Sequence, residues 1–318
     1  MEKIDLKAYY KERYEIIAGY WYETGNRVSV SDPGENRICR FCSRDSTHAT
    51  FTSESHAIPE FLGNRTVFCG NECDECNAKF GRDYEDHLAK WSHLVRSAMK
   101  IRGKKKYPTF KTDSFRIEPE KHNLHIRYLD PDTPRIDPGA VPFDHELFGD
   151  SSSQPYIPKR AAMSLTKIAA SICPPPYIHE FKRTIEWLNA PDIATISDLL
   201  VGYAFTPGPI PSAASHAFLL RRKTDDHVPY MWLILQCRNF RLQSFVPFCE
   251  SDTSWMRTNE AVSIPFYAFP SIFGEQWTWG PTQFGTLDWS SSEPQCDEAK
   301  VSFRFLSLKS TDEEPSGH

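Results

Sequence analysis

Two closely spaced pairs of cysteines carry the clearest chemical signal in this sequence. Cys39 and Cys42 form one C-x-x-C pair, and Cys73 and Cys76 form the second pair after residues 43–72. Four thiolates at tetrahedral corners bind Zn²⁺ at about 2.3 Å, and each C-x-x-C turn places two sulfur atoms on one side of the ion. We therefore predict a structural zinc site. The alternatives are two unrelated pairs or a redox dithiol, and a thioredoxin-like dithiol needs a βαβ context that we do not find. We expect the remaining cysteines to be packed thiols: Cys69, Cys173, Cys237, Cys249 and Cys296.

The segment between the pairs contains a histidine that could act as a base. The alternating stretch THATFTSES (47–55) predicts a strand that leads into His56, and Pro59 ends it. A neutral imidazole with a pKa near 6.5 can accept a proton from water at cellular pH. Beyond Pro59 we expect a turn at 62–64, a second strand at 65–68 and a helix at 72–80. The predicted order is strand, loop, strand, helix, with zinc at its ends.

This pattern resembles the HNH endonucleases, the zinc-bearing branch of the ββα-metal nucleases. The resemblance covers roughly residues 37–90 and consists of C-x-x-C, His-x-Ile-Pro-x-x-Leu-Gly and C-x-x-C-Asn. It implies metal-dependent hydrolysis of phosphodiester bonds in DNA, and bacterial anti-phage defence as a context. The matching residues are Cys39, Cys42, His56, Ile58, Pro59, Leu62, Gly63, Cys73, Cys76 and Asn77.

The resemblance also implies roles for individual residues. His56 would be the general base, and Asn77 would bind a catalytic Mg²⁺ or another divalent cation, which stabilises negative charge on the phosphoryl oxygens. The zinc would hold the helix and the histidine together without taking part in the reaction. Family members usually have an acidic metal ligand immediately before the histidine, where this sequence has Ser55. Ser55 or the adjacent Glu54 would then serve as the ligand, or the metal would rely on Asn77, water and phosphate, or the site is inactive.

A basic stretch follows the predicted HNH segment. Residues 95–111 contain seven lysines and arginines and no acidic residue, and a helix with Phe80, Tyr84 and Leu88 on its buried face leads into them. Such a stretch could bind a phosphate backbone, although a solvated basic loop would look the same. The predicted nucleic-acid contacts are Lys100, Arg102, Lys104, Lys105 and Lys106.

The remainder of the chain predicts an α+β domain with an antiparallel sheet and carries no motif for a reaction. We expect helices at 157–173, which Pro174 ends, and at 178–189. We also expect an N-terminal helix that includes Ile16, Ile17 and Tyr20. The predicted strands are 124–129, 217–223, 231–236, 240–248 and 301–308, with a turn at 224–227. The predicted divisions are a helical segment and linker (1–36), the HNH domain with its basic extension (37–112), the α+β domain (113–308) and a disordered tail (309–318).

Composition sets limits on the class of protein. The apolar content of 40% and charged content of 25% are those of a soluble globular protein. No apolar run is long enough to cross a bilayer, and the N-terminus lacks the apolar region of a secretory signal, so we expect a cytoplasmic protein. Residues 1–112 carry 19 basic against 16 acidic residues, whereas the remainder carries 18 against 26. This acidic remainder leaves room for a protein partner or a homo-oligomer.

Two other interpretations remain open from the sequence. The chain could be a zinc-containing nucleic-acid-binding module without catalytic activity, for which Ser55 is the main support. It could also be a sensor or interaction protein in which the larger C-terminal part has the principal role.

Overall fold

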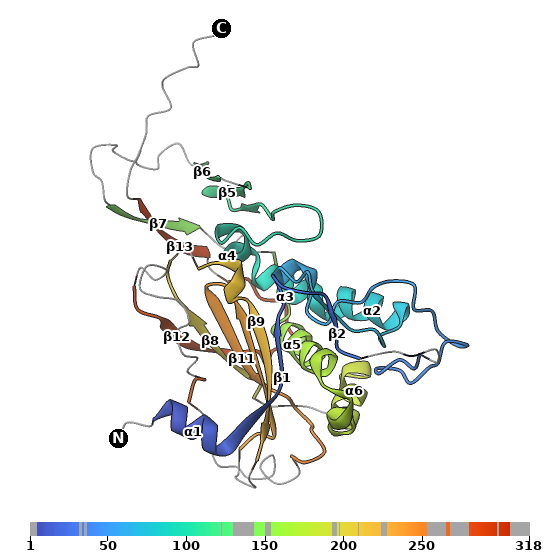
Figure 1. Ribbon diagram of the computed structural model, residues 1–318. Helices are drawn as coiled ribbons and strands as arrows, with labels where there is room; N and C mark the ends of the chain where they lie inside the picture. The colour runs from blue at the N-terminus through green and yellow to red at the C-terminus, as the bar shows by residue number, and fades with distance from the viewer. Residues whose placement is uncertain are drawn as a thin grey trace.

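A six-stranded antiparallel sheet is the largest element of the computed structural model (Figure 1). The structure describes residues 5–31, 34, 37–121, 123–129, 143–149, 154–192, 196, 198–208, 210–223, 228–252, 265–267, 280–297 and 299–305. The sheet has the order β1–β9–β10–β11–β8–β12. Its strands are β1 (Tyr14–Trp21), β8 (Leu200–Phe205), β9 (His216–Arg222), β10 (Met231–Cys237), β11 (Phe240–Phe245) and β12 (Gln283–Asp288). Every residue of β10 is buried, which explains why its sequence, MWLILQC, does not alternate.

The N-terminal prediction was wrong beyond the first helix. Helix α1 (Leu6–Arg13) begins at Asp5, whose side chain accepts hydrogen bonds from two backbone N–H groups, and it ends before β1. The expected helical positions of Ile16 and Ile17 lie in β1, which pairs with β9 across a bulge. Pairing with a distant strand overrides the helical spacing here. Along the chain, the HNH segment therefore lies between β1 and β9, which are neighbours in the sheet.

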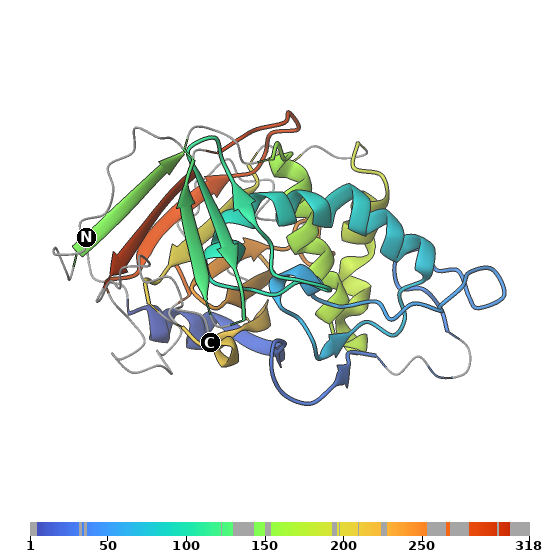
Figure 2. The same ribbon diagram turned by 90° about the horizontal axis from the view of Figure 1, so that it is seen from above.

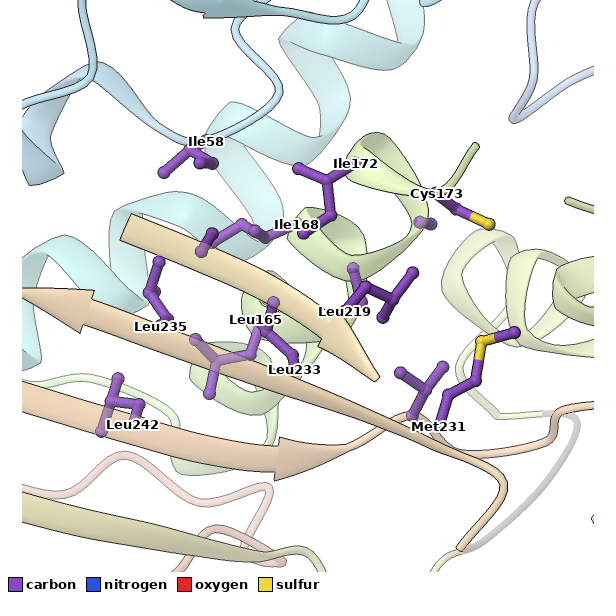
Figure 3. Packing of buried hydrophobic residues seen from close by; sticks show 14 of the residues in the cluster. Ile58, Leu165, Ile168, Ile172, Cys173, Leu219, Met231, Leu233, Leu235 and Leu242 are labelled. Carbon is purple, nitrogen blue, oxygen red and sulfur yellow. The ribbon is translucent and has the colours of Figure 1, made fainter. Parts of the chain in front are cut away.

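Helix α5 (Pro158–Ile172) lies between the sheet and the HNH segment. It begins with a proline at its first position and ends before a run of prolines, as the sequence predicted. Thirteen of its fifteen residues are buried. Figure 3 shows Leu165 and Ile168 packed toward Leu219 and Leu233 of the sheet, with Ile58 of the HNH segment on the other side. The two regions thus share one hydrophobic core.

The HNH segment is built from short elements and a broken helical rod. Figure 2 shows the rod running beside α5. The short elements are β2 (Val28–Ser29), which precedes the HNH segment, η1 (Glu60–Leu62) and β3 (Val67–Phe68). The rod consists of α2 (Asp74–Phe80), η2 (Gly81–Glu85), α3 (Asp86–Trp91) and α4 (His93–Ala98). The predicted buried face is confirmed, since Phe80, Tyr84 and Leu88 are all buried. Gly81 opens a π-helical turn within the rod, a feature that often occurs at functional sites.

The expected strand at 47–55 is absent from this described part of the chain. Only a single bridge, between His56 and Phe68, remains of the predicted hairpin, and β3 pairs in parallel with β2. Side chains take the backbone N–H groups that a ladder would need. Asp45 accepts from Thr47, and Asp74 accepts from Thr52 and Ser53. Such local bonds compete with strand formation.

The remaining elements follow the sequence in part, since the strands at 124–128 and 299–305 and the helix at 182–189 were expected and the others were not. A three-stranded sheet contains β4 (Phe110–Lys111), β5 (Phe115–Pro119) and β6 (Leu124–Tyr128), and β7 (Phe143–Gly149) pairs with β13 (Ala299–Phe305). The helix expected at 178–189 is divided into η3 (Pro175–Phe181) and α6 (Lys182–Asn189), and η4 (Ser212–Ala214) precedes β9. The α+β class is confirmed. Strand β11 is shorter than expected, and Cys296 is exposed rather than packed. The turn at 224–227 and the tail at 309–318 lie outside the described residues. No helix in the described ranges has the length and apolar character needed to span a membrane.

Candidate metal centre and catalytic site

The four predicted zinc cysteines come together in one cluster. Their Sγ atoms all lie within 4.8 Å of one another, and those of Cys42 and Cys73 are 3.7 Å apart. Four sulfur atoms about 2.3 Å from a tetrahedral ion would be about 3.8 Å apart. A hydrogen bond between Cys39 and Cys76 lowers the pKa of the Cys39 thiol and raises the pKa of the Cys76 thiol. The donor set and its spacing fit a structural zinc ion.

The cysteine cluster is anchored to the helices behind it. Arg40, inside the first C-x-x-C pair, donates hydrogen bonds to the carbonyl oxygens of Ala170, Ser171 and Cys173 at the end of α5. Backbone N–H of Cys73 donates to the Cys39 sulfur at 3.4 Å, as outer-shell donors do around a metal. The zinc end of the segment is therefore fixed both by its own sulfur atoms and by α5.

His56 lies in the loop between the two cysteine pairs, with 22% of its side chain exposed. Its ring packs against Phe68, with a centroid distance of 4.7 Å. Burial lowers the pKa of His56 below its usual value of 6.5, more than Glu60, the next cause, raises it. The imidazole is therefore neutral near pH 7, which is the form that can accept a proton.

Asn64 organises the loop that carries His56, and the sequence prediction missed it. The side chain is fully buried; its Nδ2 donates to the carbonyl oxygens of Ile58 and Val67 at 2.6 and 2.8 Å. Its Oδ1 accepts from the backbone N–H groups of Thr66 and Val67, both at 3.0 Å. Both amide hydrogens are thereby used, so the 3.3 Å approach of Nδ2 to His56 Nδ1 is a contact rather than a third full hydrogen bond. An asparagine after a glycine in a predicted turn was the available signal.

The candidate metal ligands Ser55 and Glu54 have other partners, and Asn77 does not lie in the same loop. Ser55 is buried, and its hydroxyl donates to the carbonyl oxygen of Glu72 at 3.4 Å. Glu54 is exposed and forms an ion pair with Arg27. Asn77 lies on α2 and is half-buried, and its side chain makes no hydrogen bond within the described ranges. The catalytic and metal-binding roles of these residues stay predictions.

Glu60 is the carboxylate that faces the imidazole, and it was not among the sequence candidates. Glu60 Oε2 is 3.8 Å from His56 Nε2, and Glu60 Oε1 is 3.6 Å from Arg65 Nη1. About a quarter of the Glu60 side chain is exposed, so the carboxylate borders solvent. The 3₁₀ turn after Pro59 brings it back beside His56, four positions earlier. The spacing of four residues was a usable signal only if a helical turn had been expected at this point.

The basic stretch is held by Arg65, the residue that also contacts Glu60. Arg65 donates to the carbonyl oxygens of Arg102 and Gly103, at 2.5 and 3.0 Å. Arg238 donates to the carbonyl oxygen of Met99 at 2.8 Å and pairs with Glu23. The loop is thus tied to the residue that also contacts Glu60. The side chains of Arg102, Lys104, Lys105 and Lys106 are exposed, and Lys100 is partly buried.

A buried lysine pairs with two acidic residues beneath the histidine. Lys167 of α5 lies 3.1 Å from a carboxylate oxygen of Glu72 and 3.1 Å from one of Glu85. Burial raises the pKa of Glu72 to about 7, against the lowering effect of Lys167. Only 18% of the Glu85 side chain is exposed, because its carboxylate faces Lys167. The other histidines of this region, His48, His87 and His93, contact Asp45, the backbone N–H of Ile157 and Phe110 respectively.

Comparison with known proteins concerns the segment that contains the cysteine cluster and His56. Residues 39–92 match a family model described as HNH endonuclease. No match was found among curated proteins or among solved structures. The matched residues include all four zinc cysteines, His56 and Asn77, so the resemblance inferred from the sequence is shown for this part of the chain.

Proposed function

We propose that this HNH-containing protein is a metal-dependent endonuclease that hydrolyses phosphodiester bonds in DNA. The observation that carries the proposal is a partly exposed His56 imidazole within a segment that has a four-cysteine cluster and matches the HNH endonucleases. HNH segments are associated with nuclease activity at the family level. Defence against phage DNA is the context that we propose for this activity.

His56 is the proposed general base. Its lowered pKa leaves the ring unprotonated at neutral pH, and its exposed edge can reach a water molecule bound beside the substrate. Asn64 fixes the loop on either side of the ring, so the imidazole needs little reorganisation when substrate binds.

Glu60 and Asn77 are the proposed ligands of a catalytic divalent cation. Carboxylate and amide oxygens suit Mg²⁺, and both side chains are partly accessible. A bound cation would stabilise the negative charge that develops on the phosphoryl oxygens. Ser55 is a weaker candidate because it is buried, and Glu54 is weaker because its carboxylate pairs with Arg27, whereas that of Glu60 faces His56. Glu60 thereby offers the acidic group that the residue before His56 does not.

The exposed basic loop is the proposed contact for the DNA backbone. Arg65 donates to the loop at 102–103 and also contacts Glu60, and this link between the loop and Glu60 supports the proposal. Lys104, Lys105 and Lys106 are exposed and would neutralise phosphates on either side of the cleavage point.

Cleavage of supercoiled plasmid DNA across a series of divalent cations tests this function. The zinc-loaded protein should nick or linearise the plasmid with added Mg²⁺ or Mn²⁺ and should lose this activity in a chelator weak enough to leave the cysteine site filled. DNA binding without cleavage in Mg²⁺, Mn²⁺ and Ni²⁺ would instead favour a catalytically inactive binding module. Absence of both binding and cleavage would point to a sensor or interaction protein.

A further inference from the structure

Three charged side chains form a buried cluster between the HNH segment and helix α5. The ammonium of Lys167 is 3.1 Å from Glu72 Oε2 and 3.1 Å from Glu85 Oε1. The side chains of Lys167 and Glu72 have no exposed surface, and that of Glu85 is 18% exposed. Lysine is almost never fully buried unless it is paired, so the two carboxylates account for its presence in the core.

The cluster also contacts the backbone beside the proposed base. Lys167 Nζ donates to the carbonyl oxygen of His56 at 3.4 Å, and Ser55 Oγ donates to the carbonyl oxygen of Glu72 at the same distance. The backbone N–H of Cys69 donates to the carbonyl oxygen of Ser55 at 2.8 Å. The carbonyl oxygens of both peptide units that flank the His56 Cα therefore accept hydrogen bonds, one from Cys69 and one from Lys167. Only one of these bonds, the one from Lys167, comes from outside the matched segment.

We propose that Lys167 is a positioning residue for His56, held in place by Glu72 and Glu85. Its catalytic consequence rests on the proposed nuclease function. An apolar side chain of similar length would fill the same space, but it could not donate to the His56 carbonyl oxygen. Because α5 also packs on the sheet, Lys167 connects the position of the imidazole to the core of the remainder of the chain.

A loss of this bond should lower the rate of the chemical step more than it weakens DNA binding. The contact touches only the backbone of His56, at the side away from solvent, so no substrate group depends on it directly. A displacement of about 1 Å in a reacting group can lower a rate about a hundredfold. The single-turnover rate constant is therefore the quantity that Lys167 controls.

The test compares the full-length protein with the triple variant Lys167→Met/Glu72→Gln/Glu85→Gln. The triple variant removes all three charges together, so no carboxylate is left buried without a counter-ion, as it would be in Lys167→Met alone. We expect it to retain zinc and DNA affinity but to cleave plasmid DNA about 30- to 100-fold more slowly in a single turnover. Lys167→Arg, which keeps a donor, should recover part of the rate. Ser164→Ala is the matched control, because Ser164 is a buried polar residue of the same helix whose hydroxyl has no described partner.

Nuclear magnetic resonance of the His56 ring separates this proposal from the proposed function. The imidazole signals of His56 should shift in the triple variant and stay unchanged in Ser164→Ala, whether or not the protein cuts DNA. A wild-type protein that cuts no nucleic acid, with this pattern of shifts, would reject the nuclease and keep the positioning role. Unchanged His56 signals and a wild-type rate in the triple variant would overturn the positioning role, as would an equal loss of rate in Ser164→Ala.

Discussion

The zinc end and the histidine end of the HNH segment are held in different ways. At the zinc end, four cysteines of the motif itself meet within 4.8 Å. At the histidine end, the loop is fixed by Asn64 from within and by Lys167 from a helix more than a hundred residues away, as the 111-residue separation from His56 shows. The zinc end is closed by its own four cysteines and is also anchored to α5 through Arg40, whereas the histidine end depends on the hydrogen bonds of Asn64 and Lys167. The motif therefore provides the reacting groups, and α5 contributes to their positions.

Removal of the zinc should have the largest effect. In Cys73→Ser, three thiolates remain, and we expect zinc to be lost together with the order of residues 39–80, because structural zinc contributes about 10 kcal/mol or more to the folding of small zinc domains. Metal analysis and hydrogen exchange would measure this. Exchange should rise in the segment but remain slow in β10 and β11, which are buried in the sheet.

Cys69→Ser is the control for this change, since Cys69 is a buried neighbour outside the cluster. It should retain zinc. Retention of zinc and of slow exchange by Cys73→Ser would show that the cluster is not the metal site. The zinc end would then not be held by its cysteines.

Loss of Asn64 should loosen the histidine end and leave the zinc end intact. Asn64→Ala removes the partners of two buried carbonyl oxygens and two buried N–H groups, and we expect the free energy of unfolding to fall by about 3 kcal/mol. Zinc content should not change. Urea denaturation with metal analysis checks both, and an exposed asparagine such as Asn26 provides the control. Zinc loss in Asn64→Ala would mean that the two ends are not separable.

Glu60→Gln should mainly weaken the binding of the catalytic cation, and it should also lower the pKa of His56 further. The amide keeps the size of the side chain but removes the negative charge that faces His56, so we expect the Mg²⁺ concentration for half-maximal cleavage to rise about tenfold. Titration of cleavage with Mg²⁺, and of the apo-site with Mn²⁺ by paramagnetic relaxation, measures this. Glu54→Gln is the matched control, and a larger effect there would return the ligand role to the residue beside Ser55.

Changes in the basic loop should give the smallest effect and concern DNA affinity alone. Substitution of Lys104, Lys105 and Lys106 by alanine removes up to three phosphate contacts, and the slope of log K against log salt should decrease by up to about 2.7. Fluorescence anisotropy at several salt concentrations tests this. Lys7→Ala/Lys11→Ala, on α1, changes the net charge elsewhere and should leave the slope unchanged. An equal change in both variants would show that the loop has no special part in binding.

The sequence predicted the zinc end of the segment better than the histidine end. The cysteine spacing required no knowledge of the fold, and helix α5 carries its own start and stop signals in Pro158 and the proline run after Ile172. The hairpin was overestimated because the carboxylates of Asp45 and Asp74 take backbone donors, which an alternating pattern does not reveal.

Long-range contacts account for most of what the sequence could not provide. Lys167 can be found in the sequence of a predicted helix, but its pairing with Glu72 and Glu85 cannot, because only the tertiary fold brings the three side chains together. Strand β1 was assigned as a helix for the same reason, since its pairing with β9 depends on residues about two hundred positions away. Glu60 lies within the motif, yet its approach to His56 depends on a single 3₁₀ turn.

The most direct test of the account is the single-turnover rate of plasmid cleavage by His56→Ala relative to wild type, at equal zinc content and saturating Mg²⁺. We predict a loss of at least about a hundredfold, as for the removal of a general base, with His48→Ala retaining the wild-type rate. Cleavage by His56→Ala at the wild-type rate would contradict the assignment of the base and, with it, the proposed mechanism.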